Sequence, residues 1–272
     1  MIRVSDLYCH PIKSCAGTRL DSSELTRFGL AHDRMLMLVD ANSRFLTQRE
    51  FGQLCLVQPA IVDDGVTVSA PGMSDLHFVP SNTGALVRTE VWGTPIDTAV
   101  QSADVNNWFS DFLRTDVRLV TIREGFERRI DPQYATCDTD VVSFADGYSL
   151  LLLSQESLDG LNQRLTTPVG IDRFRPNIVV CGATPHAEDT WKSLTIGSAR
   201  FSGVKPCARC GIVAVDPSTG EREKQPTATL VGYRTFEKGV MFGMNLIHHE
   251  TGLISVGDEV QIRETHEPGW LS

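Results

Sequence analysis

Residues 35–47, MLMLVDANSRFLT, carry a good hairpin signal. Two runs rich in apolar residues, Met35 to Val39 and Arg44 to Thr47, flank the turn-forming letters DANS, which predicts a β-hairpin. The same pattern returns in residues 60–69 around DDG and in residues 88–100 around GTP. Short strands joined by frequent turns favour a barrel or a sandwich, so we expect a β-rich protein.

Two segments depart from the strand pattern and predict helices. Apolar residues from Val105 to Leu113 fall at helical spacing, so we expect one helix to begin after Ser102. A second helix is expected to begin at Ser154, whose hydroxyl suits an N-cap, with Glu156 in the first turn. Its buried face is expected to carry Leu158, Leu161 and Leu165.

The rest of the chain adds strands and one polar segment. The fold class is therefore mainly β with a few helices (α+β). The polar segment 125–140 is the best candidate boundary and divides the 272 residues into β-rich units at 1–122 and 123–272. Further strands are expected over residues 2–10, 117–122, 178–181, 194–196, 212–215, 240–247 and 260–262.

The composition excludes several classes of protein. Lys plus Arg is 25 and Asp plus Glu is 34, giving a net charge of −9, which disfavours nucleic acid or an anionic membrane as a partner. No run approaches the roughly 18 to 20 apolar residues of a membrane span. The N-terminus has no signal-peptide core, and the seven Cys are odd in number and mostly scattered, so we expect a cytoplasmic protein without a disulfide framework.

Familiar catalytic motifs are missing from the sequence. It has no phosphate-binding Gly-rich loop ending in Lys-Ser/Thr, no GxGxxG after a strand, no HExxH and no GxSxG. Nucleotide hydrolysis, Rossmann-type hydride transfer and zincin proteolysis therefore lose support.

The most distinctive local feature is KPCARCG, residues 205–211, with Cys207 and Cys210. A zinc site would need two more close ligands, and the chain has no second CxxC. A redox dithiol usually lies at a helix N-terminus, whereas a strand is expected here. A single thiolate could bind a soft metal whose other ligands come from a cofactor, with Arg209 keeping the sulfur ionised. Two small buried hydrophobes remain the alternative that spacing alone favours.

Several cations lie at expected strand ends, where functional loops gather. Lys13 follows the first strand, Arg34 precedes the first hairpin, and Arg173 and Arg175 precede the strand at Ile178. Lys and Arg are the usual phosphate-binding residues, so these positions could converge on one anionic ligand. When each of these residues is considered alone, the pattern favours the simpler interpretation, a solvent-exposed charge in a loop.

Seven stretches occur along the chain in this order: HPIKSCAG (10–17), HDRMLMLVD (32–40), FADGYSLLLLS (144–154), RFRPNIVV (173–180), EDTW (188–191), KPCARC (205–210) and VDPSTG (215–220). Together they resemble the MOSC proteins of the class that contains the mitochondrial amidoxime-reducing component, and the resemblance covers about residues 1–263. It implies an N-terminal β-rich domain packed on a MOSC β-barrel, with a molybdenum–molybdopterin cofactor bound in the cleft between them.

The resemblance also implies site residues. In this family one protein Cys binds molybdenum beside the pterin dithiolene and oxo groups, and by position it matches Cys210, the expected catalytic residue. Tyr148 and Asn245 differ in type from the residues of relatives. The positions that match cofactor contacts are Lys13, Ser14, Arg34, Asp146, Tyr148, Arg175, Asn177, Arg209 and Asn245.

The activity implied is reduction of N-hydroxylated compounds: amidoximes, hydroxamic acids and N-hydroxylated bases, including detoxification of mutagenic bases. Many bacterial relatives carry a C-terminal iron–sulfur domain, but only ten residues follow Ile262 and none is Cys. We therefore expect electrons from a separate reductase or small electron carrier, and no membrane anchor. The alternative is a non-catalytic molybdenum-cofactor carrier or a sulfuration protein, although the chain has no pyridoxal-binding domain to generate sulfur.

Overall fold

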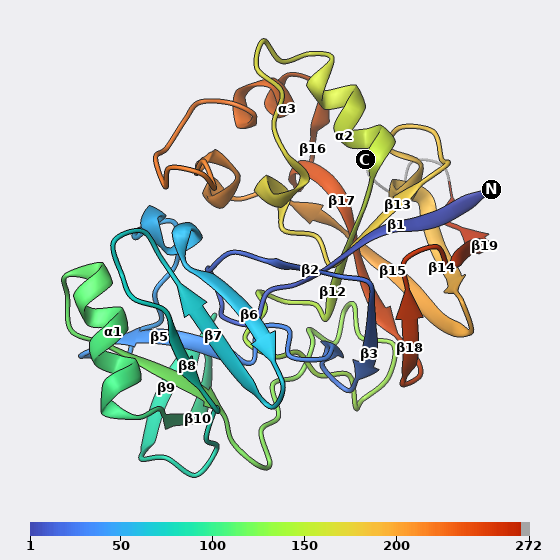
Figure 1. Ribbon diagram of the computed structural model, residues 1–272. Helices are drawn as coiled ribbons and strands as arrows, with labels where there is room; N and C mark the ends of the chain where they lie inside the picture. The colour runs from blue at the N-terminus through green and yellow to red at the C-terminus, as the bar shows by residue number, and fades with distance from the viewer. Residues whose placement is uncertain (268–272) are drawn as a thin grey trace.

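Seven strands form a closed barrel, which confirms the β-rich fold class (Figure 1). The structure is a computed structural model and describes residues 1–267. Within the barrel, β12 and β13 are parallel and the other neighbours are antiparallel, and β17 pairs back onto β12 to close the ring. The strands in barrel order are β12 (Leu150–Ser154), β13 (Ile178–Cys181), β1 (Ile2–Cys9), β19 (Glu259–Thr265), β14 (Trp191–Ile196), β15 (Ala199–Ala208) and β17 (Gly239–His248).

Helix α2 (Gln155–Asn162) makes the crossover that two parallel strands require, between β12 and β13. It begins as predicted: the Ser154 hydroxyl accepts a hydrogen bond from the Ser157 amide. Leu158 and Leu161 are buried, while Leu165 follows the helix and is only partly buried. A second short helix, α3 (Thr227–Arg234), and the two-residue strand β16 (Thr235–Phe236) precede β17.

The N-terminal unit contains two sheets and helix α1 (Ala103–Leu113), which begins after Ser102 as predicted. The helix buries its predicted apolar face, including Trp108 and Phe109, against the unit's core. The first sheet has the order β5 (Leu36–Asp40), β11 (Val117–Ile122), β10 (Thr94–Val100) and β9 (Leu86–Val91), and the second β6 (Gln58–Val62), β7 (Gly65–Ser69) and β8 (Leu76–Phe78). The hairpins expected at residues 60–69 and 88–100 are both present.

The barrel uses both ends of the chain. Strand β1 pairs with β13 and β19, and β2 (Thr18–Leu20) pairs with β1. Next to the barrel, β3 (Ser22–Thr26) joins β4 (Gly29–Leu30) and the late strand β18 (Gly252–Ser255) in a small sheet. The division at residues 122 and 123 stays a prediction.

Two predicted strands differ from the structure. Residues 212–215 do not form a strand, because Gly211–Ala214 is the 3-10 turn η4 and its Val213 packs with Phe174 and Phe242. In residues 35–47, the second arm forms no strand and makes two isolated bridges, Val39–Phe45 and Arg44–Glu90. Three further 3-10 turns occur: η1 (Gly52–Leu56), η2 (Ile171–Phe174) and η3 (Ala187–Thr190).

Within residues 1–267, no helix has both the length and the apolar character that crossing a bilayer would require.

Gly203→Ala should destabilise the barrel. A Cβ at Gly203 would press on the backbone oxygen of Trp191, which cannot move without distorting β14. We expect a loss of about 2 kcal/mol or more and a melting temperature lower by about 5 °C. The matched control is Gly232→Ala in α3, where a Cβ meets no atom within 4 Å and should not destabilise the protein. Equal melting temperatures for the two variants would contradict the packing argument.

Candidate functional site

A cavity of about 350 Å³ lies where the barrel meets the loops that follow β1 and β4. Its wall combines residues from distant parts of the sequence, including the ends of β15 and η2. All ten residues singled out from the sequence line it: Lys13, Ser14, Arg34, Asp146, Tyr148, Arg175, Asn177, Arg209, Cys210 and Asn245.

The cavity wall is strongly basic although the protein is acidic. Among the lining residues, Asp146 is the acidic one, and six are basic: Lys13, Arg34, Arg173, Arg175, Lys205 and Arg209. A net charge of −9 therefore coexists with a local cation cluster. Such a wall suits an anionic ligand, since Arg and Lys bind phosphate through charge-assisted hydrogen bonds.

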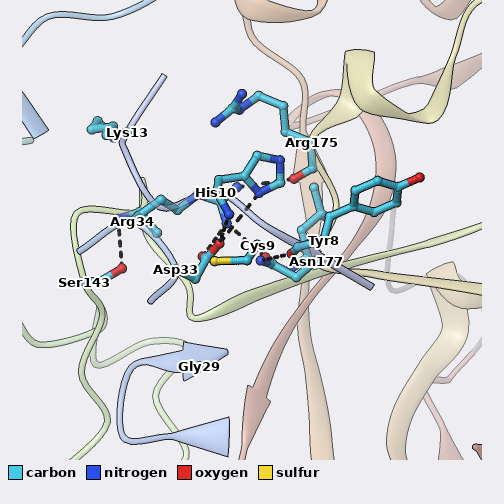
Figure 2. A network of polar contacts seen from close by, with 12 residues as sticks. Tyr8, Cys9, His10, Lys13, Gly29, Asp33, Arg34, Ser143, Arg175 and Asn177 are labelled. Atoms are coloured by element: carbon cyan, nitrogen blue, oxygen red, sulfur yellow. Dashed lines mark hydrogen bonds and ion pairs between the residues drawn. The ribbon is translucent and has the colours of Figure 1, made fainter. Parts of the chain in front are cut away.

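Asp33 lies fully buried beneath this wall and holds Arg34 in place (Figure 2). Its carboxylate accepts a hydrogen bond from the His10 backbone amide at 2.8 Å and pairs with Arg34 Nη1 at 2.5 Å. Burial alone would raise the pKa of Asp33, but the charge of Arg34, together with the hydrogen bonds of Arg34 and His10 and the charge of His10, lowers that pKa to about 2. Burial, with Arg175 and Arg34 nearby, lowers the pKa of His10 to about 3, so this ring is neutral at pH 7.

Three of the predicted residues have backbones in the left-handed region. The φ values are 69° for Ser14, 50° for Arg34 and 54° for Arg175. Side chains rarely adopt this conformation, and its cost is tolerated mainly at functional sites. Hydrogen bonds hold the backbone in each case: Gln48 Nε2 donates to the Ser14 carbonyl at 2.6 Å, the Arg34 amide to the His10 carbonyl at 2.8 Å, and the Arg175 amide to the Asp172 carbonyl at 3.1 Å.

Asn177 links three segments around the cavity. Its side-chain oxygen accepts hydrogen bonds from Arg34 Nη1 at 3.1 Å and from the Leu151 amide at 3.2 Å. Its Nδ2 donates to the Tyr8 carbonyl at 3.2 Å. The amide is thus engaged with the protein itself, which fixes β1, β12 and Arg34 relative to one another (Figure 2).

Lys13 and Asp146 form an ion pair at the cavity. Lys13 Nζ lies 2.5 Å from Asp146 Oδ1 and donates to the Phe144 carbonyl at 2.8 Å. Burial lowers the pKa of Lys13, although Asp146 acts to raise it. Withdrawal from water raises the pKa of Asp146, but the charge and hydrogen bond of Lys13, with the Trp92 hydrogen bond and the Arg49 charge, together hold it well below its usual range.

Arg175 is another cation of this wall. It is partly buried, and its guanidinium donates to the Cys15 carbonyl. Burial, and then the positive charge of Arg34, lowers the pKa of Arg175 to about 10. Two guanidinium groups in one buried wall repel each other, which favours an anion between them.

The two cysteines lie at another part of the wall, each beside an arginine. Cys210 Sγ accepts from Arg49 Nη2 at 3.2 Å, and Cys207 Sγ accepts from Arg209 Nη1 at 3.0 Å. Both thiols are partly exposed and line the cavity, so the interpretation as two buried small hydrophobes is wrong. Cys210 precedes a 3-10 turn and not the expected strand.

Tyr148 and Asn245 also reach the cavity wall. Tyr148 makes an edge contact with Tyr134, with ring centroids 5.9 Å apart, and burial raises its pKa. Asn245 lies on β17, opposite Lys205 of β15.

Sequence reasoning missed several supporting residues. Arg128 lies in the polar segment taken as a boundary, yet it is buried and donates to the carbonyls of Ser143, Ala145 and Asp146. Arg49 lies just after the first predicted hairpin, and no other feature of the sequence marked it as a functional residue. Nothing local in the sequence indicates that either side chain serves the cavity.

A closed barrel with a basic cavity and thiols in its wall defines a protein suited to bind an anionic ligand. Comparison with known proteins gives the family. Residues 1–116 match the MOSC N-terminal beta barrel domain, and residues 139–261 match the MOSC domain. The chain belongs to the MOSC family, in the class of the amidoxime-reducing components.

Relatives support this assignment over nearly the whole chain. Mitochondrial amidoxime reducing component 2 of Bos taurus is 33% identical over 94% of this chain and 82% of its own. Mitochondrial amidoxime-reducing component 1 of Homo sapiens is 32% identical over 95% of this chain and 82% of its own. Molybdenum cofactor sulfurase of Oryza sativa subsp. japonica is 30% identical over 92% of this chain but only 33% of its own.

The MOSC domain is a molybdenum-cofactor-binding domain, which confirms the predicted cofactor. The cavity fits this group by its donors. Arg173 Nη1 and Arg209 Nε are buried cavity-wall nitrogens without a hydrogen-bond partner in the part of the chain that the structure describes. Unpaired buried donors are costly and indicate that an acceptor belongs there. The cytoplasmic location stays a prediction.

Asp33→Asn should lower stability, because Arg34 would remain buried without its carboxylate. We expect a loss of about 3 kcal/mol at pH 7. The pKa of Asp33 is about 2 in the folded protein and about 4 when unfolded. The pair therefore stabilises the protein fully above about pH 4 and loses this effect as the pH falls toward 2.

Urea unfolding of the wild type and Asp33→Asn across this pH range measures the effect. The difference in free energy of unfolding should shrink as the pH falls. The control is Asp97→Asn, whose side chain is 55% exposed and pairs only weakly with Arg88. A difference between wild type and Asp33→Asn that does not change with pH would contradict the assignment.

Proposed function

We propose that this protein is a molybdenum-dependent reductase of N-hydroxylated compounds: amidoximes, hydroxamic acids and N-hydroxylated bases. The observation that carries the proposal is the partly exposed Cys210 thiol in a cavity whose other side is a cluster of cations. The relatives named amidoxime-reducing components, which this chain matches over most of both lengths, point to the same reaction class.

Each part of the cavity then has a task. Lys13, Arg34 and Arg175 bind the phosphate of the pterin, and Asn177 orients Arg34 through the hydrogen bond described above. Cys210 supplies the thiolate ligand, and Arg209 lies beside it in the same wall. Ser14, Asp146, Tyr148 and Asn245 complete the enclosure. When bound, the molybdenum cofactor supplies oxygen-atom and two-electron chemistry at the substrate.

The electron balance requires a donor. Reduction of an N-hydroxylated compound breaks the N–O bond, consumes two electrons and two protons, and releases water. We propose that a separate reductase or a small electron-carrier protein supplies these electrons. Detoxification of N-hydroxylated nucleobases is the cellular role that we propose for this reaction.

The likeness to molybdenum cofactor sulfurase favours a second candidate, a cofactor carrier or sulfuration protein. Reduced-dye assays with benzamidoxime separate the two. A reductase consumes the dye with benzamidoxime when loaded with molybdenum, whereas a carrier holds the cofactor without turnover.

Cys210→Ala should remove both bound molybdenum and turnover, because it deletes the thiolate ligand. Cys207→Ala is the matched variant: its thiol lines the same cavity, and it should retain molybdenum and most of the activity. Elemental analysis with pterin fluorescence measures occupancy, and the dye assay measures turnover. Equal losses in both variants would remove the case for Cys210 as the single ligand.

Lys13→Met and Arg175→Met should lower cofactor affinity roughly 10- to 100-fold, because each removes a charge-assisted hydrogen bond to phosphate. Methionine preserves most of the buried stem volume. Arg88→Met, at a side chain 73% exposed, controls for the general loss of positive charge. Occupancy is measured after dialysis, alongside the melting temperature. Full occupancy in the two cavity variants would argue against phosphate binding at these residues.

A further inference from the structure

Arg49 reaches the Cys210 thiol from the N-terminal unit. Its Nη2 donates to Cys210 Sγ at 3.2 Å and lies 3.6 Å from Asp146 Oδ2. The side chain is 28% exposed, so it lies at the edge of the site and not within the core. Neither the sequence motifs nor the cofactor assignment gives this residue a task.

The guanidinium of Arg49 has unused donors. Within residues 1–267, its Nη2 makes the contacts above, while Nη1 and Nε have no hydrogen-bond partner. An arginine carries five N–H donors in a fixed fork. Beside the thiol, Arg49 therefore still offers N–H groups to a molecule that enters next to Cys210.

Trp92 holds the plane of Arg49. The guanidinium carbon lies 4.9 Å from the Trp92 ring centroid, and Trp92 Nε1 donates to Asp146 Oδ1 at 3.1 Å. Phe45 supports the ring from its edge, with centroids 5.3 Å apart. Cation–π stacking and the shared Asp146 thus restrict the rotation of the guanidinium.

The backbone at Trp92 is unusual for such a residue. Trp92 and Gly93 form the two-residue turn between β9 and β10, with φ of 51° and 83°. A turn of this kind strongly favours Asn-Gly or Asp-Gly, and a bulky residue in the left-handed region is strained. Trp92 is also 50% exposed, so core packing does not explain it. The contacts of Trp92 to Arg49 and Asp146 explain why this residue stands in the turn.

We propose that Arg49, oriented by Trp92, is the substrate-positioning residue of this site and donates a hydrogen bond to the oxygen of the N–O group. This inference rests on the proposed reductase function. Because Arg49 places a further positive charge beside Cys210, at the edge of a basic cavity, the site selects neutral or anionic N-hydroxylated groups, such as amidoximes and hydroxamates. It disfavours cationic ones, such as N-hydroxyguanidines.

The test compares two substrates in the molybdenum-loaded protein. Arg49→Gln should lower kcat/KM for benzamidoxime roughly tenfold or more, mainly through KM. It should lower the value for a cationic N-hydroxyguanidine less, so the ratio of the two values falls. Arg222→Gln is the control: this exposed arginine donates to the Arg49 backbone carbonyl, at 3.4 Å, and should leave the ratio unchanged.

Trp92→Asn provides a second variant that should fold well, since it creates the favoured Asn-Gly turn. It should keep full molybdenum occupancy and lower the substrate ratio in the same direction as Arg49→Gln. Calorimetric titration with benzamidoxime gives a readout independent of turnover, and binding should weaken in both variants. Unchanged binding and an unchanged ratio in Arg49→Gln would overturn the inference.

The outcomes separate the two proposals. A loaded wild type that binds benzamidoxime through Arg49 but does not reduce it contradicts the reductase function and leaves the positioning role standing. If the wild type and Arg49→Gln reduce benzamidoxime equally well, the result contradicts only the positioning role. A loaded wild type that neither binds nor reduces benzamidoxime contradicts both.

Discussion

The buried carboxylate of Asp33 determines how the cavity presents its cations. A guanidinium can leave water only where a carboxylate and other acceptors replace its hydration. Arg34 finds these acceptors in Asp33, in the Asn177 side chain and in the Arg175 backbone carbonyl at 3.3 Å. These interactions join the loop after β4 to the segment that precedes β13, so the same contacts hold the local fold and the binding wall.

The carboxylates do not fully neutralise the cations of the cavity wall, and this matters for function. Asp33 balances Arg34, but among residues 1–267 no carboxylate forms an ion pair with Arg175, and burial followed by the repulsion of Arg34 lowers its pKa. Lys13 has Asp146, whose side chain is 53% exposed. An anion placed among these cations relieves both the repulsion and the unpaired donors. Because charges beyond about 8 Å are screened at physiological salt, the acidic surface does not cancel this local field.

Sequence patterns predicted the elements that depend on local periodicity. Alternation and turn residues were enough for β11, β13 and the β9–β10 hairpin, and a capping serine with helical spacing was enough for α2. The same reasoning failed at residues 212–215, where Val213 is buried in a 3-10 turn that packs on Phe174 and Phe242. A short apolar run does not distinguish these two ways of being buried.

The cavity itself was accessible only through the family resemblance. Lys13, Arg34 and Arg175 lie at strand ends in the sequence, but their spacing does not show that they share one wall. The family resemblance did not indicate Arg49 or Arg128 either, because the roles of both side chains depend on the tertiary structure. Arg128 holds the 143–146 loop through three carbonyl contacts, and no periodic pattern marks a residue that acts on the backbone of another segment.

The path of the chain explains why both units contribute to one site. Strand β1 belongs to the barrel and leads into Lys13 and Ser14, and after β2, β3 and β4 beside the barrel the chain enters the N-terminal unit at β5. From that unit, Arg49 donates a hydrogen bond to Cys210 and Trp92 donates one to Asp146. A ligand in this cavity therefore touches residues that are in place only when the two units are correctly packed. Binding to the folded arrangement alone stabilises that arrangement, so cofactor retention and the packing of the units are thermodynamically linked.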